Sequence, residues 1–195
     1  MVCHRGEFRR LAHLRTFGLP GGDRAVRQPR RSALGLLFEI FGPEAADHCR
    51  DWFDPLELDT LLSLLSRGVQ SPRTSSMGRL FDGVAALCGL PAKISFEGQA
   101  AMALEFAADE EEQEAYPLPL GQGTPSVADW EPMIRAVLAD RASGEPTGRI
   151  AARMHNALAE LAAAIAGRYN CSEVGLTGGC FQNALLTERV RRRLL

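Results

Sequence analysis

Apolar residues at helical spacing run through most of this chain of 195 residues. The clearest case covers residues 147–168. Its apolar positions recur at steps of four, four, three and four: Ile150, Met154, Leu158, Leu161 and Ile165. That period places them on one face of a helix. Similar stripes predict helices over residues 28–41, 44–52, 55–66, 76–87, 97–112 and 130–141, and from 181 to the chain end. The pattern therefore restricts the chain to a mostly helical fold.

Two segments, residues 8–17 and 173–177, predict strands instead, so the fold class is α/β with few strands. The second segment leads into Gly178 and Gly179, and a helix is predicted to follow. Backbone N–H groups at such a glycine pair can approach an anion closely, and the dipole of the following helix favours negative charge. A tight connection without a ligand explains the same pattern. The spacing alone leaves both interpretations open.

Residues 116–126 hold three prolines and two glycines and predict an irregular hinge. We expect it to join two blocks of one domain that covers residues 1–195. The first block is a helical segment over residues 1–115 that carries the nucleotide-contact motifs. The second, over residues 127–195, holds a helix, a strand, the glycine turn and a further helix.

Charge and cysteine usage exclude several kinds of function. There are 22 Lys and Arg against 24 Asp and Glu, and this balance argues against a dedicated nucleic-acid binder. Lys93 is the only lysine and follows no glycine-rich loop, so no Walker loop is present. No apolar run is long enough to span a membrane. The five cysteines form no Cys-x-x-Cys pair, which is typical of buried thiols in a reducing cytoplasm.

Two carboxylates are candidates for a ligand site. Asp82 lies off the apolar stripe of its predicted helix, so we expect it to face a cleft or solvent. Glu97 stands where a helix is predicted to begin. Carboxylates near helix ends of α/β proteins can hold ribose hydroxyls or a metal-bound water. Ordinary surface and N-cap acids explain the spacing equally well. His155 flanks the apolar stripe of the clearest helix, which predicts a partly buried structural residue.

Three blocks of sequence are more specific than spacing. The first is LAHLRTF at residues 11–17, with LPGGD at 19–23 and RRSAL at 30–34. The second is SSMGRLFD at residues 75–82, with FEGQAA at 96–101. The third is LTGGCFQN at residues 176–183. In this order, and over nearly the whole chain, the blocks resemble the C-terminal catalytic domain of the HypF family, the carbamoyltransferases of NiFe-hydrogenase maturation.

The resemblance implies a partial actin/Hsp70/sugar-kinase-like fold of the TsaD-like type, in which an acyl-adenylate is held between two lobes. It implies ATP and carbamoyl-adenylate as ligands. It also implies transfer of the carbamoyl group to the C-terminal cysteine of HypE, in the cytoplasm, for cyanide-ligand synthesis. The nucleotide-binding residues that it implies are Asp82, Glu97, Gly98, Gly178, Gly179 and Asn183. Cys180 replaces an expected valine and is interpreted as a packing residue.

The sequence also departs from the family pattern. A histidine motif and an Asp-Gly-Gly segment that bind a divalent metal in the full domain are absent, so no metal ligand is expected within this chain. The acylphosphatase, zinc-finger and YrdC-like domains of HypF are absent too. We therefore expect a domain truncated at both ends, which binds nucleotide weakly and does not complete carbamoyl transfer alone.

Two alternative functions are consistent with the sequence. The first is a catalytically silent helical remnant that only binds a partner such as HypE, and nucleotide binding distinguishes it from the enzyme. The second, a TsaD-like role in tRNA modification, is disfavoured by the near-neutral charge. The enzyme interpretation predicts neither a nucleic-acid nor a membrane partner.

Overall fold

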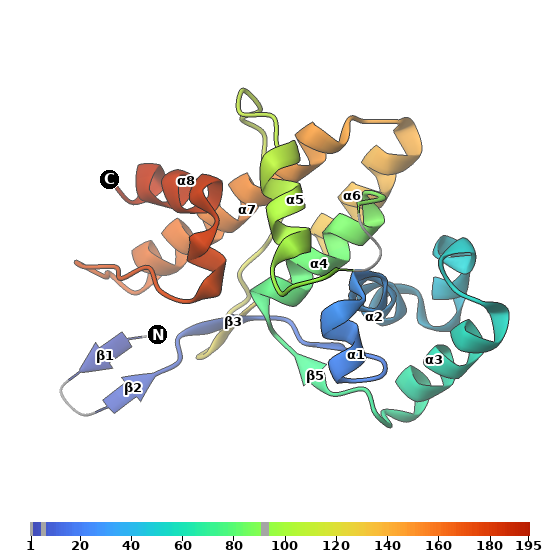
Figure 1. Cartoon of the computed structure of the whole chain (residues 1–195). Coiled ribbons are helices and arrows are strands. Elements are labelled where there is room, and N and C mark those ends of the chain that lie inside the picture. Colours follow the sequence, from blue (N-terminus) through green and yellow to red (C-terminus); the bar gives the residue numbers. More distant parts are fainter. Residues whose placement is uncertain (1, 5–6, 91–93) are drawn as a thin grey trace. The chain divides into compact units, whose positions relative to one another are not determined.

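The computed structural model describes residues 2–4, 7–90 and 94–195 (Figure 1). The chain divides into two compact units. One comprises residues 16–106, and the other joins residues 1–15 to residues 107–195. Lys93 lies outside the described residues.

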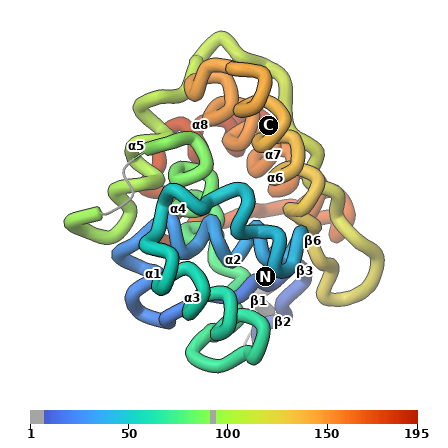
Figure 2. Tube along the Cα trace, turned by 90° about the vertical axis from the view of Figure 1, so that its right-hand side faces the viewer, coloured from blue at the N-terminus to red at the C-terminus, as the bar shows by residue number. Residues whose placement is uncertain are grey.

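The unit of residues 16–106 is built mainly from helices. Its elements are β4 (Phe17–Gly18), α1 (Asp23–Arg27), α2 (Pro29–Phe41), the 3-10 helices η1 (Gly42–His48) and η2 (Arg50–Trp52), α3 (Pro55–Arg67), β5 (Arg73–Thr74), α4 (Met77–Leu87) and α5 (Gln99–Ala107). Helices α2 and α4 lie side by side in both views (Figures 1 and 2). Their fully or almost fully buried apolar side chains form the core: Leu34, Leu36, Leu37, Leu80, Phe81 and Val84.

Helix ends in this unit follow from local sequence. Proline begins α2 and α3, where a missing N–H costs nothing. The Asp54 side chain accepts a hydrogen bond from Leu56 N and caps α3, which confirms the helix predicted over residues 55–66. The helix predicted over residues 44–52 is instead two 3-10 helices. There the Trp52 carbonyl accepts a hydrogen bond from the Arg30 side chain, whose guanidinium lies 4.5 Å from the Phe53 ring centroid.

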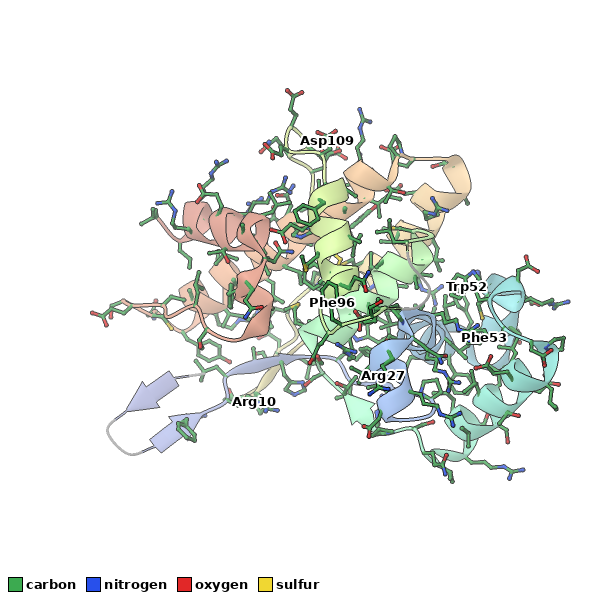
Figure 3. All side chains as sticks on the ribbon, in the orientation of Figure 1. Arg10, Arg27, Trp52, Phe53, Phe96 and Asp109 are labelled. Carbon is green, nitrogen blue, oxygen red and sulfur yellow. The ribbon has the colours of Figure 1, made fainter. Side chains whose placement is uncertain are left out.

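The helix predicted over residues 97–112 is shorter than expected, because α5 ends at Ala107. The acidic residues 109–112 would oppose the dipole at a helix C-terminus. These residues lie outside α5, which ends shortly before Asp109 (Figure 3). Arg153 lies 3.1 Å from a carboxylate oxygen of Glu112, and the Asn156 side chain donates to the Glu112 carbonyl. These contacts hold the acidic segment within the second unit.

The second unit holds the longest helix. Its elements are β1 (Val2–His4), β2 (Glu7–Arg9), β3 (Ala12–Leu14), β6 (Ser126–Ala128), α6 (Glu131–Ser143), α7 (Thr147–Arg168), the 3-10 helix η3 (Gly179–Gln182) and α8 (Ala184–Leu194). Helix α7 has the bounds predicted from its apolar period. Among the described helices, none combines the length and the apolar character needed to cross a bilayer.

The strand predicted over residues 8–17 is three short strands, because each pairs with a different partner. β2 pairs antiparallel with β1, β3 pairs parallel with β6, and β4 pairs antiparallel with β5. The parallel pair sets Ala12 opposite Ser126. This pairing joins the first residues of the chain to its C-terminal part, so the compact units do not follow the order of the two blocks expected from the sequence.

The strand predicted over residues 173–177 is wrong: these residues are described and adopt no regular structure. A strand needs a neighbour for its backbone groups, and within the described ranges no strand pairs with this segment. The helix predicted from residue 181 starts later, at Ala184, after the 3-10 turn η3.

Gly35 provides a test of the close packing of α2 on β4. A Cβ atom at Gly35 would lie 2.0 Å from the backbone oxygen of Gly18, which cannot rotate away. Alanine favours an exposed helix by about 1 kcal/mol over glycine, but this overlap outweighs it. We expect Gly35→Ala to lower the free energy of unfolding by at least about 2 kcal/mol in urea titrations.

Gly78→Ala in α4 is the matched control, because a Cβ there meets only Ser76 Oγ at 3.7 Å. This variant should be as stable as the wild type or slightly more stable. Equal stability of the two variants would contradict the packing described for Gly35.

Candidate functional site

Asp82 lies within α4 and is 1% exposed. The sequence predicted a residue facing a cleft or solvent; it is not at the solvent surface, because α4 is buried from Arg79 to Leu87. Arg79 Nη1 lies 2.8 Å from Asp82 Oδ2. Even so, neither carboxylate oxygen has a hydrogen-bond partner among the described residues. Asp82 therefore keeps two buried acceptor oxygens to which no described residue donates a hydrogen bond.

Burial dominates the electrostatics of Asp82. It raises the pKa of the carboxyl group from 3.8 to about 6; the positive charge of Arg79 opposes this rise and the negative charge of Glu97 adds to it. Near neutral pH the ionised form predominates, inside a medium that solvates it poorly. Hydrogen-bond donors from a ligand would stabilise that form.

Arg79 connects the parts of this site. Its Nη1 donates to the Val26 carbonyl at 3.2 Å, and its Nη2 lies 3.7 Å from Glu97 Oε1. The Glu97 side chain is 81% exposed, so this second ion pair is weak. Sequence reasoning missed Arg79 as a site residue. The signal was available, since an arginine three residues before an aspartate on a helix faces it.

Gly98 follows Glu97 and directly precedes α5. Its φ of +86° favours glycine, and nothing lies within 4 Å of the position that a Cβ would take. Its carbonyl accepts a hydrogen bond from Met102 N at 2.9 Å, which begins the helix. The neighbouring Phe96 is about half exposed (Figure 3). The structure thus brings Asp82, Glu97 and Gly98 together in the unit of residues 16–106, with Arg79 between the two carboxylates.

Gly178, Gly179 and Asn183 belong to the other unit. Gly178 has φ +95° and ψ 165°, a conformation essentially reserved for glycine. Gly179 has no positive φ, and a Cβ atom on it would meet nothing within 4 Å. Protein packing therefore does not require glycine at position 179. An open backbone at this point lets a ligand approach closely.

Asn183 ends the glycine turn and caps α8. Its Oδ1 accepts a hydrogen bond from Leu186 N at 2.7 Å. Its Nδ2 lies 2.9 Å from Nε2 of the fully buried His155. His155 had been expected only partly buried and was not predicted to contact the site. The helix expected right after the glycines begins only after η3, so its dipole is displaced from them and the open backbone of the turn is what an anion could approach.

Cys180 stands between the glycines and α8. Burial raises the pKa of its thiol above the usual value of 9.0, so it stays protonated at neutral pH. This agrees with a packing role. The described residues hold no group of three or more His, Cys, Asp or Glu placed to bind a metal ion. Two surface hollows of about 560 and 640 Å³ are lined by other residues.

A family model for the carbamoyltransferase Kae1-like domain, second subdomain, matches residues 1–195. The chain therefore belongs to this family of carbamoyltransferase domains, and its α/β fold with few strands is that of the family.

Its relatives are HypF proteins. Carbamoyltransferase HypF of Synechocystis sp. (strain ATCC 27184 / PCC 6803 / Kazusa) is 40% identical over 93% of this chain and 26% of its own length. The HypF of Rhodobacter capsulatus is 38% identical over 96% of the chain and 24% of its own length. The chain thus spans about a quarter of the length of these curated relatives.

Solved structures agree with this membership. A full-length HypF in a phosphate- and nucleotide-bound form superposes with a TM-score of 0.89 at 35% identity, covering 98% of this chain and 26% of that one. The HypF of T. kodakarensis gives a TM-score of 0.79 at 26% identity, covering 94% of this chain and 26% of that one.

The raised pKa of Asp82 makes a prediction about stability. The folded protein holds this proton more tightly than the unfolded chain, so the ionised carboxylate destabilises the fold above pH 6, and this cost disappears as pH falls toward 4. A rise of two pKa units corresponds to about 3 kcal/mol. We expect Asp82→Asn to be more stable than the wild type by up to about 3 kcal/mol at pH 8.

The two proteins should unfold alike near pH 4. Urea unfolding at both pH values measures the difference, in which contributions of other groups cancel. A variant that is less stable than the wild type at pH 8 would contradict the assignment.

Proposed function

We propose that the chain forms part of a HypF-type carbamoyltransferase, which passes a carbamoyl group from carbamoyl-adenylate to the C-terminal cysteine of HypE. Membership of the carbamoyltransferase family and the likeness to HypF proteins support this. The proposal places the reaction in hydrogenase maturation, in the cytoplasm. There the thiols of the chain, such as those of buried Cys49 and Cys88, stay reduced. The partners are HypE and the acylphosphatase, zinc-finger and YrdC-like domains of HypF.

The observation that carries the proposal is the buried Asp82 carboxylate, whose two oxygens have no hydrogen-bond partner among the described residues. Hydroxyl groups of a ribose are suitable donors for such oxygens. Arg79 keeps the carboxylate ionised and in place, at 2.8 Å. Glu97 and Gly98 border the same part of the chain, where the backbone at Gly98 is open. We assign these residues to the nucleoside side of the ligand.

We assign Gly178, Gly179 and Asn183, which belong to the other unit, to phosphate binding. The two glycines leave their backbone open, so N–H groups of the turn can approach phosphate oxygens. Asn183 contributes by fixing the end of this turn to α8. The relative whose structure is described as phosphate- and nucleotide-bound supports the same ligand chemistry.

The transfer step needs little from this chain beyond binding. The thiolate of the acceptor cysteine attacks the carbamoyl carbon and forms a C–S bond. The bond from that carbon to the phosphate oxygen breaks, and AMP leaves with the electron pair. Backbone donors at the glycine turn then stabilise the charge that grows on the phosphate. A divalent metal would neutralise phosphate charge in the full domain. The described residues include no group of three or more His, Cys, Asp or Glu placed to hold such an ion.

A partner-binding module without a nucleotide site is the alternative function. One observation favours it: Met102 and Phe106, one turn apart on α5, are 42% and 80% exposed. An exposed apolar stripe is typical of a protein-binding surface. Nucleotide binding separates this alternative from the carbamoyltransferase.

Calorimetric titration with AMP and ATP tests the proposal. We expect the wild-type chain to bind both and Asp82→Asn to bind at least about tenfold more weakly, because a neutral amide replaces a charged acceptor. Asp47→Asn is the matched control, since the Asp47 side chain is exposed and forms an ion pair with the exposed Arg50. Absence of binding, or equal binding by Asp82→Asn, would favour the partner-binding module.

The glycine turn gives a second test. Gly179→Ala should change the free energy of unfolding by no more than about 0.5 kcal/mol, because its Cβ meets no protein atom. The same methyl group stands where phosphate would approach, so affinity for AMP should fall several-fold. Gly178→Ala should instead destabilise the fold by about 1–3 kcal/mol, since its backbone conformation is strained for alanine. AMP affinity unchanged in Gly179→Ala would exclude phosphate from this turn.

A further inference from the structure

His155 lies in α7, far from the glycine turn in sequence, and is completely buried. Both ring nitrogens have polar neighbours. Nδ1 lies 2.7 Å from the carbonyl oxygen of Ala151, one turn earlier in the helix. Nε2 lies 2.9 Å from Asn183 Nδ2.

These neighbours determine the protonation of the ring. A carbonyl oxygen only accepts hydrogen bonds, so Nδ1 must carry a proton. A second proton on Nε2 would bury a positive charge and point it at a donor amide. His155 is therefore neutral, with the proton on Nδ1, and Nε2 is an acceptor.

The acceptor at Nε2 in turn determines how the Asn183 amide is oriented. The amide must present its NH₂ group to Nε2, which directs Oδ1 the other way. There Oδ1 accepts the hydrogen bond from Leu186 N at 2.7 Å that caps α8. A flipped amide would lose the cap and place two donors against each other at Leu186. Only one orientation of the Asn183 amide therefore satisfies both His155 Nε2 and the cap of α8.

The cap is joined to the glycine turn. Asn183 N donates to the Cys180 carbonyl at 3.3 Å, and Thr187 Oγ1 donates to the Phe181 carbonyl at 2.9 Å. Gly178 O accepts from Phe181 N at 3.1 Å, which closes the turn. The orientation of one amide therefore influences the backbone of residues 178–183.

We propose that His155 is the positioning residue of this turn: its Nε2 orients the Asn183 amide, and the oriented amide holds the turn in the form that receives phosphate. The effect on ligand binding rests on the proposed nucleotide function, whereas the orientation of Asn183 does not. His155 does not itself touch the ligand and acts through Asn183.

The protonation state provides the first test. In ¹⁵N-labelled wild-type protein we expect the His155 ring to show a protonated Nδ1 and a bare Nε2 at neutral pH. Asn183→Asp replaces the donor at Nε2 by a carboxylate, so there the ring should take a second proton. A wild-type ring protonated on Nε2 would overturn the proposal, whatever the nucleotide does.

Two amide variants provide the second test. His155→Gln places an acceptor oxygen near the position of Nε2, whereas the shorter side chain of His155→Asn cannot reach Asn183. We expect amide hydrogen exchange at Leu186 to speed up about tenfold in His155→Asn, the loss of one N-cap, and to return close to the wild-type rate in His155→Gln. Equal exchange in both variants would contradict an acceptor role.

AMP affinity provides the functional readout. It should fall about tenfold in His155→Asn and recover in His155→Gln. If wild-type protein binds no AMP, the proposed function fails while the ring protonation and the exchange rates still decide the role of His155. If wild type binds AMP and both variants bind equally well, the positioning role is excluded and the proposed function is kept.

Discussion

The Arg79 guanidinium, buried among helices, is the charge on which the candidate site depends. It is 8% exposed and lies 2.8 Å from one oxygen of Asp82. It also donates to the Val26 carbonyl at the end of α1 and approaches Glu97. A buried charge needs such partners. Because its partners come from three separate segments, Arg79 fixes where α1, α4 and the segment before α5 meet.

At Asp82 the stability of the fold and the proposed ligand binding make opposite demands on the carboxylate. Its carboxylate is more deeply buried than Arg79, yet the described protein groups offer its oxygens no hydrogen bond. Burial raises its pKa to about 6, so the ionised form destabilises the folded chain at neutral pH. In the proposed nucleotide site this arrangement would favour binding, since the ligand would supply hydrogen bonds that the described residues do not. The glycine turn is a similar case. A Cβ at position 179 would meet no protein atom, so packing does not explain the glycine there.

The predictions from the sequence were most accurate where local rules determine the structure. The apolar period predicted the observed bounds of the helix over residues 147–168, and the motif singled out Asp82 as a candidate site residue. The strand predicted over residues 173–177 failed because a strand depends on a neighbour that no local pattern reveals. Arg79 and His155 were missed for a related reason. For His155 the decisive contact is with Asn183, 28 residues later, which an apolar flank does not indicate. For Arg79 the spacing to Asp82 was visible in the sequence, but the contact with Val26 was not.

Amide chemical shifts of ¹⁵N-labelled protein during titration with AMP test whether this chain binds nucleotide. We expect the signals of residues 79–82 and 98 and those of residues 178–183 to shift, while the signals of α3 stay unchanged. Shifts in neither set of residues, at AMP concentrations up to the millimolar range typical of weak ligands, would contradict the assignment of this chain to nucleotide binding.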